Sequence, residues 1–237
     1  MDHGIRDSIV CIKYYRCLAY IALVTFLTCF NTAFAEENSI EVNVNAGYAA
    51  DFAYSGALSS YLSGTPLMGA TIGVHALVPI LSFTNSDIVI PMLGLGLNYT
   101  NTYANFMGSA TSLNTQDSFT ATYTNLSAEG NAGAKFKFGS YTYYGLMNLG
   151  YAIQDSFTIL DNNNASLNLF SLYHYYVGAT VGGAYGLSSS MKLGLQGTYN
   201  WHTMAFYNEN QVASPTPGDV RTSFTEATLS FLFTYDF

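Results

Sequence analysis

The sequence predicts an all-β fold: an eight-stranded antiparallel up-and-down transmembrane β-barrel, preceded by a cleaved signal peptide. Three observations predict it. Apolar and polar residues alternate with a period of two in eight segments, charged residues make up only 9% of the 237 residues, and no apolar run of about 18 residues follows the N-terminal segment. Because lipid cannot satisfy free backbone groups, a membrane protein without spanning helices has to close its sheet into a barrel.

The first 35 residues have the pattern of a secretory signal peptide. Basic residues precede an apolar stretch over Cys17–Phe30, and Ala33 and Ala35 place small residues at the spacing that a signal peptidase requires. We expect cleavage after Ala35, which leaves residues 36–237 as one outer-membrane barrel domain; the alternative is a buried N-terminal helix. All three cysteines lie before this point, so disulfides and thiol chemistry are excluded from the mature domain.

The expected mature domain is acidic and poor in charge. Taking three basic and two acidic residues of the leader from the totals of 7 and 15 leaves 4 and 13, a net charge of −9. The absence of a basic patch disfavours nucleic-acid binding. Aromatic residues make up 16% of the chain, and this combination with few charges is unusual for a soluble surface.

The first four strands are expected at about 40–49, 67–80, 88–100 and 122–138. Each alternates an apolar face with a polar face. In the first strand, Glu41 lies on the face opposite to Val42 and Val44. In the fourth strand, the polar face carries Glu129, Lys135 and Lys137.

The other four strands are expected at about 141–154, 169–185, 191–206 and 221–237. Their polar faces carry His174 in the sixth strand, Lys192 and His202 in the seventh, and Glu226 and Asp236 in the closing strand. The opposite face of the closing strand is formed by aliphatic and aromatic residues and ends on Phe237.

The connections between these strands alternate in length. Short turns are expected at about 81–87, 139–140 and 186–190, and long connections at about 50–66, 101–121, 155–168 and 207–219. The long connections are rich in Ser, Thr, Asn and Gly. Short turns on one rim and long loops on the other are typical of outer-membrane barrels, whose long loops lie outside the cell.

Alternation alone does not say which face meets lipid, since a soluble lipocalin-like barrel has the same period. The apolar faces carry almost no charge, and tyrosines lie near the strand ends on these faces. Both features favour an apolar outer surface bounded by interfacial aromatic residues, with the polar face turned to the lumen.

The signal peptide, the strand repeat, the loop asymmetry and the ending Tyr235-Asp236-Phe237 together resemble the small eight-stranded bacterial outer-membrane barrels. That family includes the OmpA transmembrane domain and the OmpX/Ail-like proteins. The resemblance implies a Gram-negative outer-membrane location, contact with lipid and lipopolysaccharide, and recognition of the closing strand and Phe237 by the barrel-assembly machinery. We also expect a monomer.

The lumen of such a barrel is narrow enough to be filled by side chains. We expect a polar network there, made of Glu41, Glu129, Lys135, Lys137, His174, Lys192, His202, Glu226 and Asp236. Heights along the strands predict an ionic cluster of Glu41, Lys137, Lys192 and Asp236 at the periplasmic end. Buried charges have to be paired, so this cluster is interpreted as a plug rather than a gate.

Higher in the lumen, His174, His202 and Glu226 come from neighbouring strands. Two imidazoles and a carboxylate can bind a divalent metal or respond to pH, but a hydrogen-bonded lumen without metal is favoured because the spacing matches no metal motif. An enzyme would require a nucleophile motif, and the nearest candidates are His202 with Asp219 and Ser214. We therefore expect no catalytic site, no metal and no cofactor.

The function favoured by these features is structural or surface-interacting: envelope integrity, adhesion or resistance. Any extracellular ligand would bind loops such as Asn105–Gln116 and Asn162–Ser166, because binding residues generally lie on loops over a rigid scaffold. The first alternative is a narrow channel for small or hydrophobic solutes, of the OmpW kind. The second is a lipid-modifying barrel enzyme.

Overall fold

The computed structural model describes residues 40–62, 64–80, 88–109, 116–161, 166–208 and 221–237. The chain divides into two units, Met1–Ser39 and Ile40–Phe237, and the description below concerns the second. The expected signal peptide, with its cleavage residues Ala33 and Ala35, lies outside the described residues and stays a prediction.

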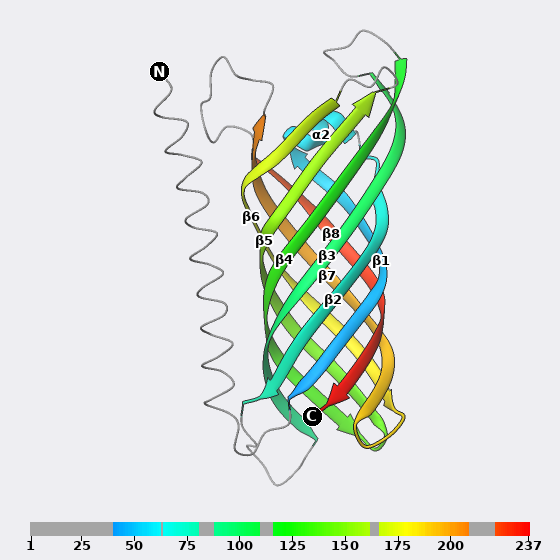
Figure 1. Cartoon of the computed structure of the whole chain (residues 1–237), viewed down its shortest axis with the longest axis vertical. Helices are drawn as coiled ribbons and strands as arrows, with labels where there is room; N and C mark the ends of the chain where they lie inside the picture. The colour runs from blue at the N-terminus through cyan, green and yellow to red at the C-terminus, as the bar shows by residue number, and fades with distance from the viewer. Residues whose placement is uncertain (1–39, 63, 81–87, 110–115, 162–165, 209–220) are drawn as a thin grey trace. The chain divides into compact units, whose positions relative to one another are not determined.

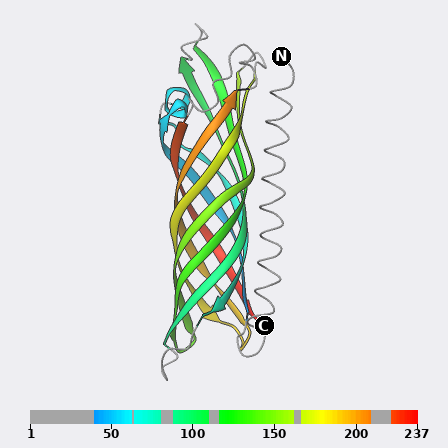
Figure 2. The same ribbon diagram turned by 90° about the vertical axis from the view of Figure 1, so that its left-hand side faces the viewer.

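The described residues form the predicted all-β fold, a closed barrel of eight antiparallel strands in sequence order (Figure 1). The strands are β1 (Glu41–Gly56), β2 (Leu67–Pro79), β3 (Val89–Ser109), β4 (Gln116–Phe138), β5 (Tyr141–Asp161), β6 (Ser166–Gly186), β7 (Met191–Asn208) and β8 (Arg221–Asp236). The ring closes where β1 pairs with β8, with Glu41 opposite Asp236. The strands run at a marked tilt to the long axis, as closure of a sheet into a barrel requires (Figure 2).

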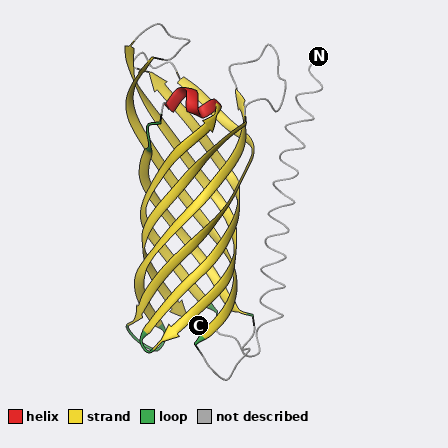
Figure 3. Cartoon of the chain, turned by 180° about the vertical axis from the view of Figure 1, so that it is seen from behind, coloured by secondary structure: helices red, strands yellow, loops and turns green. Residues whose placement is uncertain are grey.

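Most strands are longer than expected, and they extend into the segments predicted to be long loops. The fifth strand reaches Asp161 rather than residue 154, and the third reaches Ser109 rather than residue 100. A short helix, α2 (Ala57–Leu62), follows β1 at the end of the barrel away from the C-terminus (Figure 3). No helix among the described residues has the length and apolar character needed to cross a membrane.

Two pairs of tyrosines on the outer surface mark the edges of an apolar band. Tyr141 lies opposite Tyr185. Tyr151, ten residues later in β5, lies opposite Tyr175, ten residues earlier in β6. Ten residues span roughly 33 Å along a strand at about 3.3 Å per residue. At a tilt of about 40° this corresponds to a height of about 25 Å, the height of the apolar band of outer-membrane barrels.

The surface between these tyrosines is aliphatic and exposed. Leu149, Val181 and Leu229 are 67%, 66% and 64% exposed, and Phe231 is 70% exposed. In water such a continuous surface would favour aggregation, whereas in a bilayer it contacts the acyl chains. Trp201 and Tyr199 lie exposed on β7 near the upper edge, which agrees with the predicted aromatic girdle.

Above the upper tyrosines, the polarity of the wall is reversed. In the lower part of β4, Ser127 and Glu129 are buried inside the barrel. Nearer the start of the same strand, Phe119, Ala121 and Tyr123 are the buried residues, and threonines alternate with them on the other face. The upper part of the barrel therefore has an apolar interior and a polar outer face, like a soluble protein, and it projects from the membrane.

Irregularities in the strand pairing lie close to this change. The β4–β5 register shifts between Leu126 and Ser127, and the β6–β7 register shifts between Ser171 and Tyr173. A β-bulge inserts an extra residue and so changes which residues face inward beyond it. In β5 the buried positions change from Gly150 and Ala152 to Asp155 and Phe157 across the shift, whereas the odd-numbered residues of β4 stay buried from Phe119 to Asn131.

Candidate functional site: a lumen closed at both ends

The periplasmic end of the lumen is closed by an ionic cluster. Glu41 Oε2 lies 2.6 Å from Lys135 Nζ and 3.3 Å from Lys192 Nζ, and Lys192 Nζ lies 2.8 Å from Asp236 Oδ2. Glu41, Lys135 and Lys192 are buried. Four strands, β1, β4, β7 and β8, contribute one residue each, so the cluster crosses the whole barrel.

Lys137 does not join this cluster, although the sequence predicted it there. It lies one residue before the end of β4, at the rim of the barrel, and is exposed. Lys135, two residues further into the wall, provides the cation instead. The height along the strand suggested Lys137 for the cluster. The wall of the barrel ends at that height, so Lys137 lies at the rim and outside the lumen.

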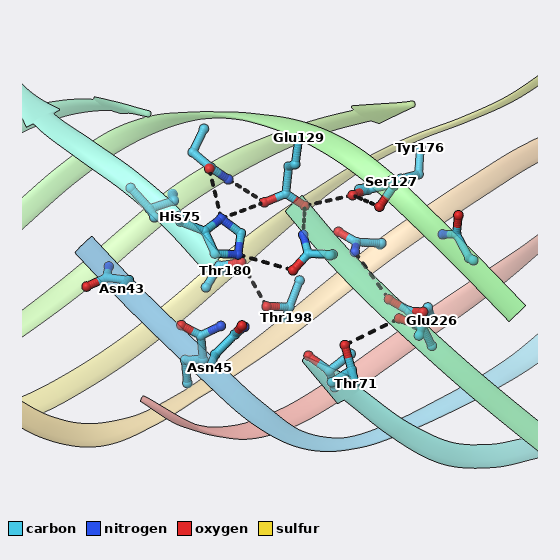
Figure 4. Close-up of a pocket in the computed structure, with 18 of the residues that line it drawn as sticks. Asn43, Asn45, Thr71, His75, Ser127, Glu129, Tyr176, Thr180, Thr198 and Glu226 are labelled. Carbon is cyan, nitrogen blue, oxygen red and sulfur yellow. Dashed lines mark hydrogen bonds and ion pairs between the residues drawn. The ribbon is translucent and has the colours of Figure 1, made fainter. Parts of the chain in front are cut away.

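A hydrogen-bonded network around Glu129 fills the middle of the lumen (Figure 4). Glu129 Oε2 accepts hydrogen bonds from the Tyr176 hydroxyl at 2.9 Å and from Asn98 Nδ2 at 3.1 Å, and Oε1 accepts one from Asn131 Nδ2 at 2.5 Å. His75 Nδ1 lies 3.6 Å from Oε1. The carboxylate thus accepts hydrogen bonds from β3, β4 and β6, and Tyr176 reaches it across Gly150 from two strands away.

The predicted pair His174 and His202 are in direct contact. His174 Nε2 and His202 Nδ1 are 2.8 Å apart, and His174 Nδ1 lies 2.8 Å from Asp155 Oδ2. Ser171 donates a hydrogen bond to the other carboxylate oxygen of Asp155. The sequence did not indicate Asp155 because it was assigned to a loop, whereas it is a buried residue of the extended β5 strand.

Glu226, the third member of the predicted trio, has a different partner. Its Oε1 accepts a hydrogen bond from Asn200 Nδ2 at 3.5 Å. Within the described part of the chain, no group of three or more His, Cys, Asp or Glu side chains is arranged to hold a metal ion. The trio therefore does not form a three-ligand metal centre.

An apolar core closes the extracellular end of the lumen. Leu58 and Leu62 of α2 are 1% and 0% exposed. The residues packed together there are Leu58, Leu62, Leu67, Ala104, Phe119, Ala121, Tyr123, Phe157, Ile159, Leu169, Met204 and Phe224. The rings of Phe224 and His202 stack at 4.5 Å with an interplanar angle of 9°, so the apolar core lies directly on the histidine pair.

Several predicted binding or catalytic segments lie outside the described residues. They include residues 110–115 of the loop range Asn105–Gln116, residues 162–165 of the range Asn162–Ser166, and both Ser214 and Asp219 of the enzyme alternative.

Comparison with known proteins gives structural neighbours only. No family profile matches the sequence, and no curated protein matches it. Neisserial surface protein A is 15% identical, with a TM-score of 0.45, covering 85% of this chain and all of the other. Ail, the attachment invasion locus protein of Yersinia pestis, is 12% identical, with a TM-score of 0.38 and coverage of 82% and 98%.

The outer membrane protease OmpT from Escherichia coli is 9% identical, with a TM-score of 0.46 and coverage of 84% and 97%. At these low scores, conclusions about this chain depend on its own side chains. The closed sheet, the aliphatic band about 25 Å high and the aromatic residues at its edges decide where the barrel resides. It is an outer-membrane β-barrel.

Proposed function

We propose that this outer-membrane barrel is a non-conducting scaffold that presents a rigid surface outside the cell. The observation that supports this most directly is the double closure of the lumen. The ionic cluster around Glu41 fills the periplasmic end, and the apolar core around Leu58 and Leu62 fills the extracellular end. A solute path through the lumen would have to disrupt both.

The reversed polarity above the upper tyrosines supports a role in surface contact. The packed upper strands offer a firm support for surface contact, and rigid support favours binding by loops. Envelope integrity, adhesion and resistance all belong to this class of function. Lipid and lipopolysaccharide are the proposed partners in the membrane, with assembly through the strand ending in Phe237 as a monomer.

Planar-bilayer recordings test the closed lumen. We expect no steady openings from the wild-type protein. The variant Glu41→Gly with Leu62→Gly weakens both closures and is expected to give measurable openings. Steady conductance from the wild type would instead favour the narrow channel.

Loop replacement tests the surface role. Residues 105–116 and 162–166 are replaced by Gly-Ser sequences of equal length, and attachment of bacteria carrying the variant to host-matrix components or serum factors is measured. The matched control replaces residues 187–190, a periplasmic turn, in the same way. Loss of attachment in the loop variant alone supports the proposal, while equal attachment in all three proteins contradicts it. Lipid mass spectra that change on incubation with the protein would favour the lipid-modifying enzyme.

A further inference from the structure

The polar middle of the lumen contains a small cavity whose wall is rich in unused hydrogen-bond acceptors. The cavity has a volume of about 30 Å³. Four lining residues are buried and carry a side-chain atom with no hydrogen-bond partner among the described residues; these atoms are Asn45 Oδ1, Asn125 Oδ1, Glu226 Oε2 and His202 Nε2. An unpaired buried polar atom costs free energy, so four around one cavity indicate a guest that accepts electron pairs or donates hydrogen bonds.

The histidine pair sets the state of His202. His174 Nδ1 faces the Asp155 carboxylate, so this nitrogen carries a proton and donates a hydrogen bond to Asp155. The two rings share one proton between His174 Nε2 and His202 Nδ1. When His202 Nδ1 donates it in a hydrogen bond to His174, His202 Nε2 is left free to accept a hydrogen bond.

The acidic groups at the cavity have no lysine or arginine among the described residues to pair with. The barrel domain has four basic residues. Lys135 and Lys192 are bound to Glu41 at the periplasmic end, and Lys137 and Arg221 are exposed. Glu226, in contrast, lies opposite Asp51 across the β8–β1 pair.

Asp51 is a second buried carboxyl group beside Glu226. It is 0% exposed, accepts a hydrogen bond from Thr102 through Oδ2, and leaves Oδ1 without a partner among the described residues. Two neighbouring buried carboxylates without a cation are costly.

We propose that this cavity binds a hard divalent cation, Mg²⁺ or Ca²⁺, together with one or two water molecules. Glu226 and Asn125 supply oxygen ligands, the type that these ions prefer, and His202 Nε2 accepts a hydrogen bond from a coordinated water. The cavity is too small for an organic cation, since it admits only a few atoms the size of water. Asp51, opposite Glu226, is the second carboxyl group that the cation would allow to ionise. This site is independent of the surface role proposed above.

Refolding with and without metal tests the site, because an ion in a closed lumen has to enter before the barrel closes. The full barrel is unfolded in urea and refolded into neutral detergent free of lipopolysaccharide, with CaCl₂, MgCl₂ or EDTA. After desalting, retained metal is measured by mass spectrometry and the unfolding temperature is measured by tryptophan fluorescence. We expect about one retained ion per chain and a higher unfolding temperature than in EDTA.

Three variants make the test specific. Glu226→Gln removes the charged ligand, and Asn125→Ser removes an acceptor without changing the charge; both are expected to lose the retained ion and the metal-dependent shift. Asn148→Ser is the matched control for Asn125→Ser, since Asn148 is a buried amide of β5 that hydrogen-bonds to Thr180 and does not line the cavity. It is expected to keep the ion.

Two results would overturn the site. The first is wild-type protein that retains no more Ca²⁺ or Mg²⁺ than Glu226→Gln. The second is metal retention that Asn148→Ser loses to the same extent as Asn125→Ser.

Discussion

Lys135 Nζ lies 2.6 Å from Glu41 Oε2, which joins β4 to β1 across the inside of the barrel. Lys192 shares the same carboxylate oxygen at 3.3 Å. Glu41 therefore contacts two buried lysines, and for Lys135 it is the sole ion-pair partner among the described residues.

Glu41→Leu is expected to destabilise the barrel strongly. The substitution leaves Lys135 buried without a partner, and breaking a buried ion pair in this way costs about 3–5 kcal/mol. Urea unfolding in detergent, followed by tryptophan fluorescence, measures the change. Lys137→Gln is the control, because Lys137 is exposed, and it is expected to stay within about 0.5 kcal/mol of the wild type. Equal effects from the two substitutions would show that the cluster does not stabilise the fold.

Val181→Arg tests the lipid-facing band. Val181 is 66% exposed and lies between Tyr175 and Tyr185, near the middle of the band. An arginine there is expected to cost about 2–4 kcal/mol of folding free energy in lipid vesicles. Asn168→Arg, on the same strand above Tyr175, is expected to cost much less because that part of β6 meets water. If Asn168→Arg is as damaging as Val181→Arg, the membrane boundary is misplaced.

Leu62→Asp tests the apolar core above the membrane. The substitution places a carboxylate at a fully buried position of α2, at a cost of several kcal/mol. Because the part below has its own polar network, we expect local opening: faster proteolysis and hydrogen exchange in α2 and the upper strands, with the lower strands still protected. Leu62→Met conserves volume and is expected to cost less than about 1.5 kcal/mol. Uniform loss of protection along all strands would mean that the two parts unfold together.

Gly150→Ala is expected to distort the lumen. A Cβ at Gly150 would lie 1.9 Å from Cζ of Tyr176, whose hydroxyl bonds to Ser127 and Glu129. Forcing an extra carbon into such a packed site typically costs about 1–3 kcal/mol. A Cβ at Gly145, on the same strand, would meet no described atom within 4 Å, so Gly145→Ala is the matched control and is expected to be neutral or slightly stabilising. Unchanged unfolding midpoints for both variants would contradict the close packing of Tyr176.

The part of the fold inside the membrane could be predicted from the sequence because lipid imposes one simple rule. Apolar residues such as Val181 and Phe231 face outward, and polar residues such as Glu129 face inward, along the lower part of every strand. This rule gives the number of strands, the order of the strands and the positions of the short turns.

The part above the membrane could not be predicted in the same way. There, the outer face of β4 and β5 carries residues such as Thr122 and Thr158, whose composition is also that of a loop. The β-bulge at Ile153 changes the phase of the alternation in β5, so a single period does not continue through that strand. The upper strands and their core therefore resemble long loops in the sequence.

The sequence predicted most residues of the candidate site, but fewer of the contacts between them. Contact between His174 and His202 follows from their similar height on neighbouring strands, but the link to Asp155 required the true extent of β5. Lys135 is buried and Lys137 is exposed because the rim of the barrel lies between them, and the alternation of the sequence does not show where the rim lies.

The placement of the ion pairs also bears on how faithfully the sheet assembles. Glu41 and Asp236 belong to the first and last strands, which meet at the seam, while their lysines come from β4 and β7. A barrel that closed with the seam slipped along its length would strand a lysine among apolar side chains. The ion pairs form only when β1 and β8 pair in the correct register, so the cluster disfavours barrels that close with a shifted seam.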